Sequence, residues 1–470
     1  MSTGAVQIGS DRQLFLDDMW LDNQENIRLR MHTPEAREVA LTADQPWESG
    51  GVHYSTVIED EGRFRMWYRC DIGAGRENRD GESMMCYAES TDGINWDKPN
   101  LGLVDWAGSR DNNLILPTDD LHGINASVIK DPNGAPGEKY KMITREKTKP
   151  IDAILGFVSD DGIHWTRTGP DPILTGRPFD SHNILLWDEA SEKYVIYMRG
   201  HSTSVGGTFG PTKDGHRSIR RSESTDFLNW SEPETVIESD DDDPPGLHFY
   251  TNSGLKYGRA ANAYLMFPMI LYPERVHPSA PIPGLSDIQM ATSRDGITWE
   301  RRFREPYIRP GLDLRNWVDR NPIMGPGILE LAPGELSMYY VELYREGPDA
   351  RFRRCTIRTD GFVSVEGPYK GWGEFVTPPL TFTGDQLELN YSTAGGGSIF
   401  VEIQTEDGTP IDGLSLDDCN EVFGDKIEGV VAWKDGAALG AHAGNPVRLR
   451  IKLRDANLYA FRFGNGEGTK

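Results

Sequence analysis

A seven-residue turn motif that returns at nearly constant intervals constrains the fold more than any other feature of the sequence. Four copies have the form Ser-x-Asp-x-x-x-Trp and end at Trp96, Trp165, Trp230 and Trp299, and a degenerate fifth copy contains Asp360. Successive aspartates are 69, 65, 69 and 65 residues apart. We expect these aspartates to accept backbone N–H bonds, as turn-forming Asp residues do, while the tryptophans fill space between repeated β-sheet units.

Each copy of the turn has the same surroundings. An aromatic-rich strand precedes it, for example over residues 62–69, 138–145 and 192–199, another β-rich run lies further upstream, and a short segment with proline follows. Four strands in each of five repeats predict an all-β fold, with a five-bladed β-propeller over residues 1–370. Residues 13–16 are expected to form a strand that closes the ring or braces the first blade.

Beyond the predicted propeller the pattern changes. From residue 375 onward the turn motif is absent and apolar residues alternate with polar ones, which is the period of a strand with one buried face. The alternation covers residues 387–391, 399–403, 447–451 and 458–463. We therefore predict a separate β-sandwich domain over residues 371–470.

Charge and cysteine content limit the partners of the chain. The 73 Asp and Glu exceed the 49 Lys and Arg, and the formal net charge of −24 disfavours nucleic acid and anionic membranes. Four cysteines are too few for a disulfide framework, and none forms a C-x-x-C pair. Residues 1–11 contain no basic stretch followed by an apolar one, and no apolar run approaches about 18 residues. We expect a soluble, cytoplasmic protein.

A five-bladed propeller followed by a β-sandwich resembles the glycoside hydrolases of families 32, 43 and 117. The Ser-x-Asp-Gly-x-x-Trp turn is also similar to the Asp-box of sialidases, one residue shorter here. The resemblance implies a glycosidase of carbohydrate metabolism and polysaccharide degradation, acting at the end of an oligosaccharide. The Asn-Asp-Pro-Asn-Gly, Arg-Asp-Pro and Glu-Cys signatures of family 32 do not occur at the expected places. Site residues are therefore predicted from their positions in the blades, because a fold alone does not define a function.

Propeller geometry places substrate-facing residues at the starts of first strands, at the ends of second strands and in the loops that follow. The predicted starts of the first strands are rich in polar and aromatic residues, and four of the ten histidines lie there. We predict a substrate-binding role for Trp47, His53, Tyr54, Asn125, His182, His248, Tyr250, Asp319 and Arg320. The alternative is that these polar residues only line a solvated funnel.

Three arginines end successive second strands in register. Arg69, Arg145 and Arg199 are expected to converge on one mouth, where guanidinium groups can bind a carboxylate or sulfate bidentately. The predicted substrate is therefore an oligosaccharide with an anionic sugar. The alternative is that each arginine forms a salt bridge with a neighbouring acid.

Glycoside hydrolysis uses two carboxyl groups that flank the scissile bond. We predict Glu48 and Asp180 as this pair, with Glu342 in reserve and Asp319 and Asp18 as further candidates. Asp180 opens the third blade, where the resemblance to family 43 places the general acid. A separation of about 6.5–9.5 Å between the carboxyl groups would leave room for a water molecule and lead to inversion, which we favour. A structural hydrogen-bonding role is the alternative for each residue.

Two other functions fit the same residues. A polysaccharide lyase would use His or Tyr as base and acid on a uronate that the arginines hold, and a non-catalytic sugar-binding propeller would need no carboxylate pair. No cofactor is predicted. A metal ion in the central funnel is kept as an alternative, with His53, His122, His182 and His248 as its ligands.

Overall fold

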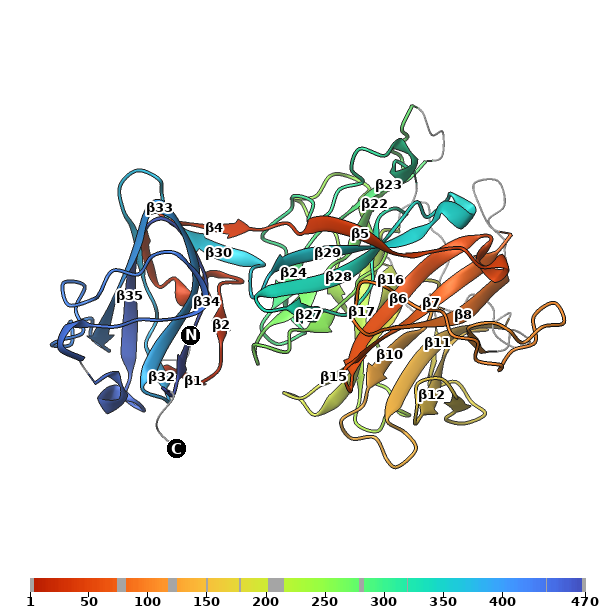
Figure 1. Ribbon diagram of the computed structural model, residues 1–470, viewed down its shortest axis with the longest axis horizontal. Helices are drawn as coiled ribbons and strands as arrows, with labels where there is room; N and C mark the ends of the chain where they lie inside the picture. The colour runs from red at the N-terminus through yellow and green to blue at the C-terminus, as the bar shows by residue number, and fades with distance from the viewer. Residues whose placement is uncertain are drawn as a thin grey trace. The chain divides into compact units, whose positions relative to one another are not determined.

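The computed structural model describes residues 4–73, 82–116, 125–148, 151–176, 179–201, 215–278, 283–318, 320–436 and 438–466 (Figure 1). The chain divides into two compact units. Unit 1 comprises Met1–Thr33, Tyr257–Ala263 and Ile357–Lys470, and unit 2 comprises Pro34–Lys256 and Tyr264–Thr356. The predicted all-β fold is confirmed, because the described residues form strands and short 3-10 helices only. None of the helices in this part of the chain is long and apolar enough to cross a membrane.

Unit 2 begins with three antiparallel sheets that follow one another along the chain (Figure 1). The first contains β6 (Gly51–Asp60), β7 (Arg63–Ile72), β8 (Glu82–Ser90) and β9 (Leu114–Leu116). The second contains β10 (Ser127–Lys130), β11 (Tyr140–Thr148), β12 (Ile151–Ser159), β13 (Thr166–Arg167) and β14 (Leu174–Thr175). The third contains β15 (Ile184–Asp188), β16 (Lys193–His201), β17 (Arg217–Ser224) and β18 (Glu234–Ile237).

The next repeat is divided between two small sheets. One contains β19 (His248–Phe249), β22 (Met269–Tyr272) and β23 (Leu285–Ile288), and the other contains β20 (Leu255–Lys256), β21 (Tyr264–Met266), β24 (Ala291–Ser293) and β25 (Trp299–Glu300). Backbone bonds from Tyr250 N to Met269 O (2.8 Å) and from Phe267 N to Asn252 O (3.0 Å) connect their strands across the interruption. The count of five blades stays a prediction.

The last sheet of unit 2 takes its outer strand from the other end of the chain. It contains β26 (Ile323–Met324), β27 (Leu329–Ala332), β28 (Glu335–Glu342), β29 (Arg351–Arg358) and β5 (Glu35–Thr42). β5 pairs antiparallel with β29, so that Glu35 lies opposite Thr356. The expectation that residues 13–16 close the ring is wrong. β2 (Gln13–Leu14) pairs with β35 (Val447–Gly464) in unit 1, where its apolar neighbours Phe15 and Leu16 are buried.

The four aspartates of the turn motif have the predicted structural role. In each, Oδ1 accepts the N–H groups of the second and third following residues at 2.7–2.9 Å. Two of the tryptophans pack against aromatic rings of neighbouring sheets: Trp96 lies 5.7 Å from Tyr339 and Trp299 lies 5.6 Å from Tyr197, between ring centroids. Trp230 instead packs against Phe227 of its own turn.

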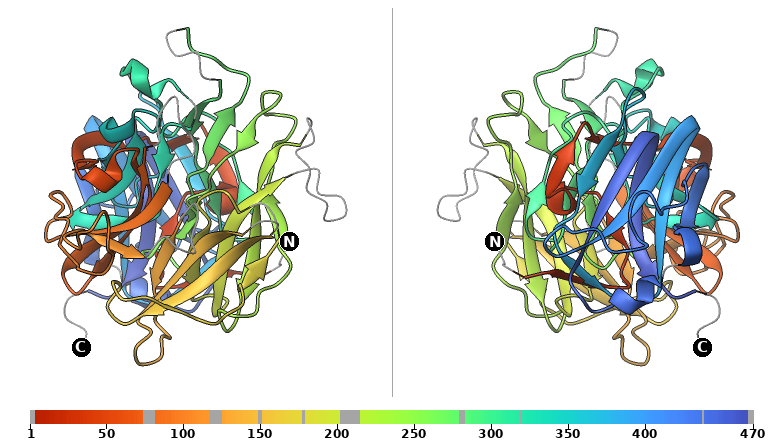
Figure 2. Two further views of the ribbon diagram at one scale, coloured as in Figure 1. Left: turned by 90° about the vertical axis from the view of Figure 1, so that its right-hand side faces the viewer. Right: turned by 90° about the vertical axis from the view of Figure 1, so that its left-hand side faces the viewer.

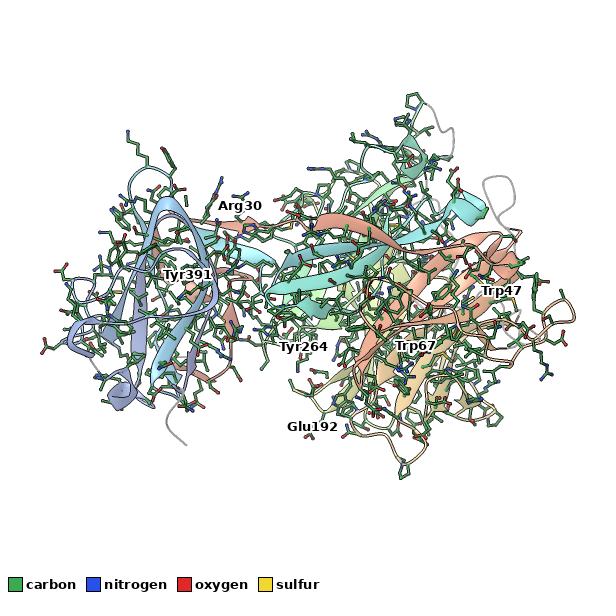
Figure 3. The ribbon with its side chains drawn as sticks, viewed as in Figure 1. Arg30, Trp47, Trp67, Glu192, Tyr264 and Tyr391 are labelled. Atoms are coloured by element: carbon green, nitrogen blue, oxygen red, sulfur yellow. The ribbon has the colours of Figure 1, made fainter. Side chains whose placement is uncertain are left out.

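Aromatic side chains also tie these turns to a neighbouring sheet. The indole of Trp67, labelled in Figure 3, donates to the carbonyl of Gly162 at 2.7 Å, and Tyr197 donates to that of Gly296 at 2.5 Å. Tyr339, on β28, donates in the same way to the carbonyl of Gly93 in the turn that follows β8. The last sheet therefore contacts the first, and the succession of sheets closes into a ring.

Replacing Asp226 by alanine is expected to lower the stability of unit 2 by about 1 kcal/mol at pH 7, the usual size of a lost capping side chain. The N–H and side-chain amide of Asn229 hold the pKa of Asp226 at about 2, below its ordinary value of 3.8. The stabilisation is therefore present above about pH 4 and is lost as the pH falls to about 2. In thermal melting at a series of pH values, the Tm values of the wild type and of Asp226→Ala should converge as the pH falls through this interval. A difference in Tm that does not change with pH would contradict the assignment.

The fifth copy of the motif does not belong to the propeller. Asp360 is fully buried in unit 1, where it accepts a bond from Tyr257 Oη (2.8 Å) and pairs with Arg12 (3.0 Å). The predicted boundary at residue 371 is corrected to 357, and residues 4–33 join the C-terminal unit. In the other repeats the motif turn leads from the third strand to the outer strand of the same sheet. In the last sheet β5 is the outer strand, so the chain leaves unit 2 after β29.

Unit 1 is the expected β-sandwich, and its two layers share two long strands (Figure 2). β33 (Gln386–Thr405) and β35 pair along their length, and the register shifts between Thr393 and Ser398, where three consecutive glycines lie. The parts of β33 before and after the glycines bury side chains, such as Leu389 and Ile403, in one core. The stacked rings of Phe382 and Phe463 lie in the same core. The remaining strands are β1 (Val6–Gly9), β3 (Asn23–Glu25), β4 (Arg28–Met31), β30 (Val363–Glu366), β31 (Gly373–Val376), β32 (Leu380–Phe382) and β34 (Asp425–Val430). The 3-10 helices of the two units are η1 (Asp18–Trp20), η2 (Pro46–Glu48), η3 (Leu314–Asn316), η4 (Gly347–Asp349), η5 (Lys434–Gly436) and η6 (Leu439–His442).

Candidate functional site

Tyrosine and arginine side chains from several sheets of unit 2 meet at the strand ends that the sequence predicts to face the substrate. Arg320 connects two of the tyrosines, since its guanidinium lies 5.7 Å from the ring centroid of Tyr250 and 5.6 Å from that of Tyr344. Tyr344 in turn lies 6.5 Å from Tyr54. We call this group the tyrosine–arginine cluster; its members are Tyr54, Tyr250, Tyr344, Arg69, Arg199, Arg217 and Arg320.

Tyr250 has the most unusual electrostatic environment in the cluster. Arg320 Nη1 donates to its hydroxyl at 3.1 Å, and the guanidinium groups of Arg199 and Arg217 lie 4.1 and 5.3 Å from its ring centroid. Burial alone would raise the pKa of Tyr250, but the charges of Arg199 and Arg320 outweigh it and hold the pKa below its ordinary value of 10.0. Burial raises the pKa of Tyr54 and of Tyr344 instead. Tyr250 is thus the tyrosine whose phenolate is stabilised.

Arg217 is a half-buried cation without a carboxylate partner in the part of the chain that the structure describes. Its Nη1 lies 2.7 Å from His248 Nδ1, and its Nε is buried with no hydrogen-bond partner there. Burial and the neighbouring Arg199 lower the pKa of Arg217. An uncompensated buried charge is costly, and a bound anion would relieve it.

The three arginines that end the second strands are each paired with an acid. Arg69 binds Asp71 through two bonds of 2.6 and 3.0 Å, and Arg145 binds Asp152 through two bonds of 2.7 and 3.0 Å. Arg199 Nη1 binds Asp180 at 2.6 Å. The salt-bridge alternative therefore describes the pairing of these three residues, and their binding of a substrate anion stays a prediction.

Asp180 is the predicted catalytic carboxylate that remains accessible. Its side chain is 46% exposed although its partner Arg199 is buried. Burial raises the pKa of Asp180, but Arg199 and Arg145 lower it more, so the pKa lies below its ordinary value. In the free protein Asp180 is therefore an ionised group at the edge of the tyrosine–arginine cluster.

Glu48 is fully buried, and its carboxylate is used by the protein itself. Oε2 accepts the N–H groups of Asp44 (3.0 Å) and Gln45 (3.1 Å) and pairs with Lys98 (2.6 Å), and Oε1 accepts the hydroxyl of Tyr68 at 2.7 Å. We assign Glu48 a structural role at η2, in correction of its predicted catalytic role. The sequence does not show these partners, because Lys98 is 50 residues away.

Glu342 and Trp47 also have structural partners, and Asp18 lies in the other unit. Glu342 is buried between Arg351 (2.9 Å) and Arg353 (2.6 Å), and Asp18 lies in η1 of unit 1. Trp47, labelled in Figure 3, packs 5.6 Å from Trp106 between ring centroids and donates to Asn113, so it belongs to the core. The predicted carboxylate pair is therefore not assembled by Glu48 or Glu342.

Three of the predicted histidines lie around the cluster. His53 packs against Tyr344 at 4.3 Å with the two rings tilted by 49°, and His182 packs against Tyr54 at 5.3 Å, between ring centroids. Burial lowers the pKa of His53, His182 and His248 to about 4, so all three are neutral at pH 7. The described residues contain no group of three or more His, Cys, Asp or Glu side chains that could hold a metal ion. His122 and Asp319 lie outside the described residues.

Supporting residues fix the geometry of the cluster. Asn125 accepts a bond from Arg69 (2.8 Å) and donates to the carbonyl of Ser181 (3.1 Å). Tyr54, Arg320 and Leu343 have positive φ angles of 45°, 61° and 60°. Non-glycine residues rarely adopt this conformation, and strain of this kind concentrates at functional sites.

Two members of the cluster were not predicted. Arg217 begins β17, a third strand, whereas the prediction considered only first and second strands. Tyr344 lies two residues after β28, in a loop of the kind that the prediction considered. The nearby Glu342 was chosen instead because it carries a carboxylate. A search for aromatic residues beside arginines at every strand end of one face would have found both.

No protein-family model matches the chain. Two curated proteins of Mycobacterium tuberculosis, the uncharacterized proteins MT1551 and Rv1502, are each 27% identical to it over 164 residues, which cover 34% of this chain and 49% of theirs. The chain thus spans about half the length of the curated relatives it matches.

Glycoside hydrolases are among the solved structures that the chain resembles. One named a glycoside hydrolase is 15% identical with a TM-score of 0.48 and covers 70% of this chain and 93% of its own. A family 43 arabinoxylan arabinofuranohydrolase from Bacillus subtilis is 13% identical with a TM-score of 0.41, covering 92% and 99%. An N-acetylgalactosamine deacetylase from F. plautii is 14% identical with a TM-score of 0.45, covering 71% and 98%. At these identities and TM-scores we derive no activity and no site residue from them.

Proposed function

We propose that the protein is a glycosidase for oligosaccharides that carry a carboxylate or sulfate group, with Tyr250 as the group that reacts with the sugar. The observation that carries this proposal is the environment of Tyr250: an arginine donates to its hydroxyl and two more flank its ring, so its pKa lies below the ordinary value despite burial. Exo-action and a cytoplasmic location stay predictions.

A tyrosine suits an anionic substrate for an electrostatic reason. A carboxylate nucleophile next to an anionic sugar would place two negative charges together, whereas a tyrosine becomes charged only as far as its surroundings stabilise the phenolate. Tyrosine nucleophiles are known among glycosidases in the sialidases. Arg199 and Arg320 would lower the pKa of Tyr250, and Arg217 would bind the anionic group of the substrate.

Asp180 is the candidate for protonating the leaving oxygen and then activating water. In the free protein the nearby arginines keep its pKa low. A bound anion would neutralise part of that positive field and exclude water, and both changes raise the pKa of a carboxyl group. Substrate binding would thus convert Asp180 from a salt-bridge partner into a general acid.

The same tyrosine supports a second candidate function, the lyase. The carboxylate pair of an ordinary glycosidase is not assembled by Glu48 or Glu342, and a phenolate can remove the proton next to a uronate carboxylate and return it to the leaving oxygen. A panel of uronate-containing and sulfated oligosaccharides distinguishes the candidates. New reducing ends alone indicate a hydrolase, the ultraviolet absorbance of an unsaturated uronate indicates a lyase, and binding without either product contradicts both.

Replacing Arg217 by leucine is expected to raise KM for an anionic oligosaccharide by about tenfold or more and to leave kcat within a few-fold of the wild type, because a charged hydrogen bond contributes about 1.5–3 kcal/mol. The reason is that Arg217 holds the substrate without reacting. Steady-state kinetics with a matched neutral oligosaccharide is the control. An unchanged KM for the anionic substrate would show that Arg217 does not bind the anion.

A further inference from the structure

A cavity of unit 2 has a volume of about 520 Å³ and contains no residue of the tyrosine–arginine cluster. It is bordered by β22, β23 and three connecting segments. The residues that form its walls include Tyr272, Leu285, Asp287, Arg309 and Trp317, with prolines at 244, 245, 273, 306 and 310. The size is that of an ordinary small-molecule site, and so is the combination of apolar walls with few polar groups.

One polar group of the cavity wall, the carboxyl group of Asp287, is only partly satisfied by the described residues. Asp287 Oδ1 is buried and has no hydrogen-bond partner among the described residues. Burial raises the pKa of Asp287 to about 7, against the lowering effect of Arg309. A buried acceptor without a partner costs about 1–3 kcal/mol, and a ligand that donates a hydrogen bond would recover this energy.

The cavity lies next to the tyrosine–arginine cluster. In the sheet β19–β22–β23, Phe249 is opposite Ile270, which is opposite Asp287. Two strand spacings, about 10 Å, therefore separate the backbone of Asp287 from that of Phe249, the residue that precedes Tyr250. The side chains of Phe249 and Tyr250 leave opposite faces of the chain and pack in different clusters. On the other side Ser286 exchanges bonds of 2.8 and 3.1 Å with the backbone of Asn321, which follows Arg320. One elongated ligand could reach both places.

We propose that this cavity is a second sugar-binding subsite, in which Asp287 accepts hydrogen bonds from the hydroxyl groups of a neutral sugar unit and Trp317 packs against its ring. The inference rests on the proposed function, since it assigns the cavity to another unit of the same oligosaccharide. Trp317 is suited to this role because its indole N–H is held by the carbonyl of Gly311 at 2.9 Å, which fixes the ring.

Other ligand classes fit less well. An anionic group would be repelled by Glu274 and by the ionised form of Asp287, and a small cation would be repelled by Arg275 and Arg309; all four residues line the cavity. A neutral sugar offers hydroxyl donors to Asp287, acceptors to the arginines and an apolar ring face to Trp317 and Tyr272.

Isothermal titration of the full chain with a panel of neutral di- to hexasaccharides tests the subsite directly. At least one oligosaccharide should bind the wild type, and Asp287→Asn and Trp317→Ala should each weaken its affinity about tenfold or more. Asp171→Asn, which changes an exposed aspartate of the same unit, is the matched control and should bind as the wild type does. Absence of binding to the wild type, or equal binding by both cavity variants, would overturn the inference.

Turnover separates this inference from the proposed function. The cavity variants should raise KM for a long anionic oligosaccharide while leaving its kcat, and both constants for an anionic disaccharide, unchanged. If anionic substrates are cleaved but the variants show no length-dependent loss, the subsite is wrong and the proposed function stands. If nothing is cleaved but neutral sugars bind through Asp287 and Trp317, the cavity still binds sugar and the proposed function is wrong.

Discussion

Replacing Tyr250 by phenylalanine is expected to lower kcat on an anionic oligosaccharide by about 10²–10⁴-fold, the usual contribution of a side chain that transfers a proton or reacts in the transition state. KM should change little, because the phenylalanine ring can keep the contact with Arg199. Tyr369→Phe, at a tyrosine that is 85% exposed, is the control and should leave kcat and KM unchanged. Single-turnover and steady-state kinetics measure the effect.

The pH profile provides a second readout for Tyr250. If the phenolate reacts, the rate should rise with pH to a plateau through the pKa of Tyr250, which Arg199 and Arg320 hold below 10.0. Arg320→Gln should move this rise to higher pH, because one positive charge and a donor to the hydroxyl are lost. Near-normal turnover of Tyr250→Phe, or a profile that does not move, would exclude Tyr250 as the reacting group.

Replacing Glu48 by alanine is expected to destabilise unit 2 by about 3–5 kcal/mol, the usual effect of removing one partner of a buried ion pair. Lys98 would be left 10% exposed without its main counter-charge, and the N–H groups of Asp44 and Gln45 would lose their acceptor. Urea unfolding followed by tryptophan fluorescence measures the change. Replacing Lys98 by methionine in the same chain should recover part of the loss, because it removes a buried cation whose remaining carboxylate partner is the exposed Asp44 at 2.7 Å.

The Glu48 variants also separate the structural role from a catalytic one. Glu48→Gln should lower stability but keep kcat within a few-fold of the wild type in the folded fraction. A loss of about 10² in kcat with unchanged stability would return Glu48 to the catalytic group.

The repeated turn makes the ring of sheets predictable because its chemistry is local. A Ser and an Asp two residues later satisfy each other and the adjacent backbone wherever the motif occurs, and the Trp at the end packs as a ring, so each copy marks one repeat. The boundary at Ile357 and the pairing of β5 with β29 depend on contacts between distant segments, and no local pattern records them. For the same reason the fifth motif, at Asp360, misleads.

The sequence indicates which strand ends carry the candidate site, but it does not indicate which of the charged groups there are already paired. Strand order places Tyr250, Asp180 and Arg320 at the same end of the strands, and the structure brings these residues together around one cluster. The sequence does not show whether a charged group is already neutralised: Glu48 is paired with Lys98, whereas Arg217 has no carboxylate partner among the described residues. Whether a group is paired depends on side chains that are distant along the chain.

The pairing of β5 with β29 has a consequence for biosynthesis. A ribosome produces residues 35–42 long before it produces their partner, so this strand must wait as an unpaired edge while the intervening sheets form. Unpaired edges promote aggregation, and charged side chains protect them. Glu35, Arg37 and Glu38 are exposed on this strand, and their charges would disfavour its pairing with other chains before β29 is made. The ring therefore becomes complete only when its last strand has left the ribosome.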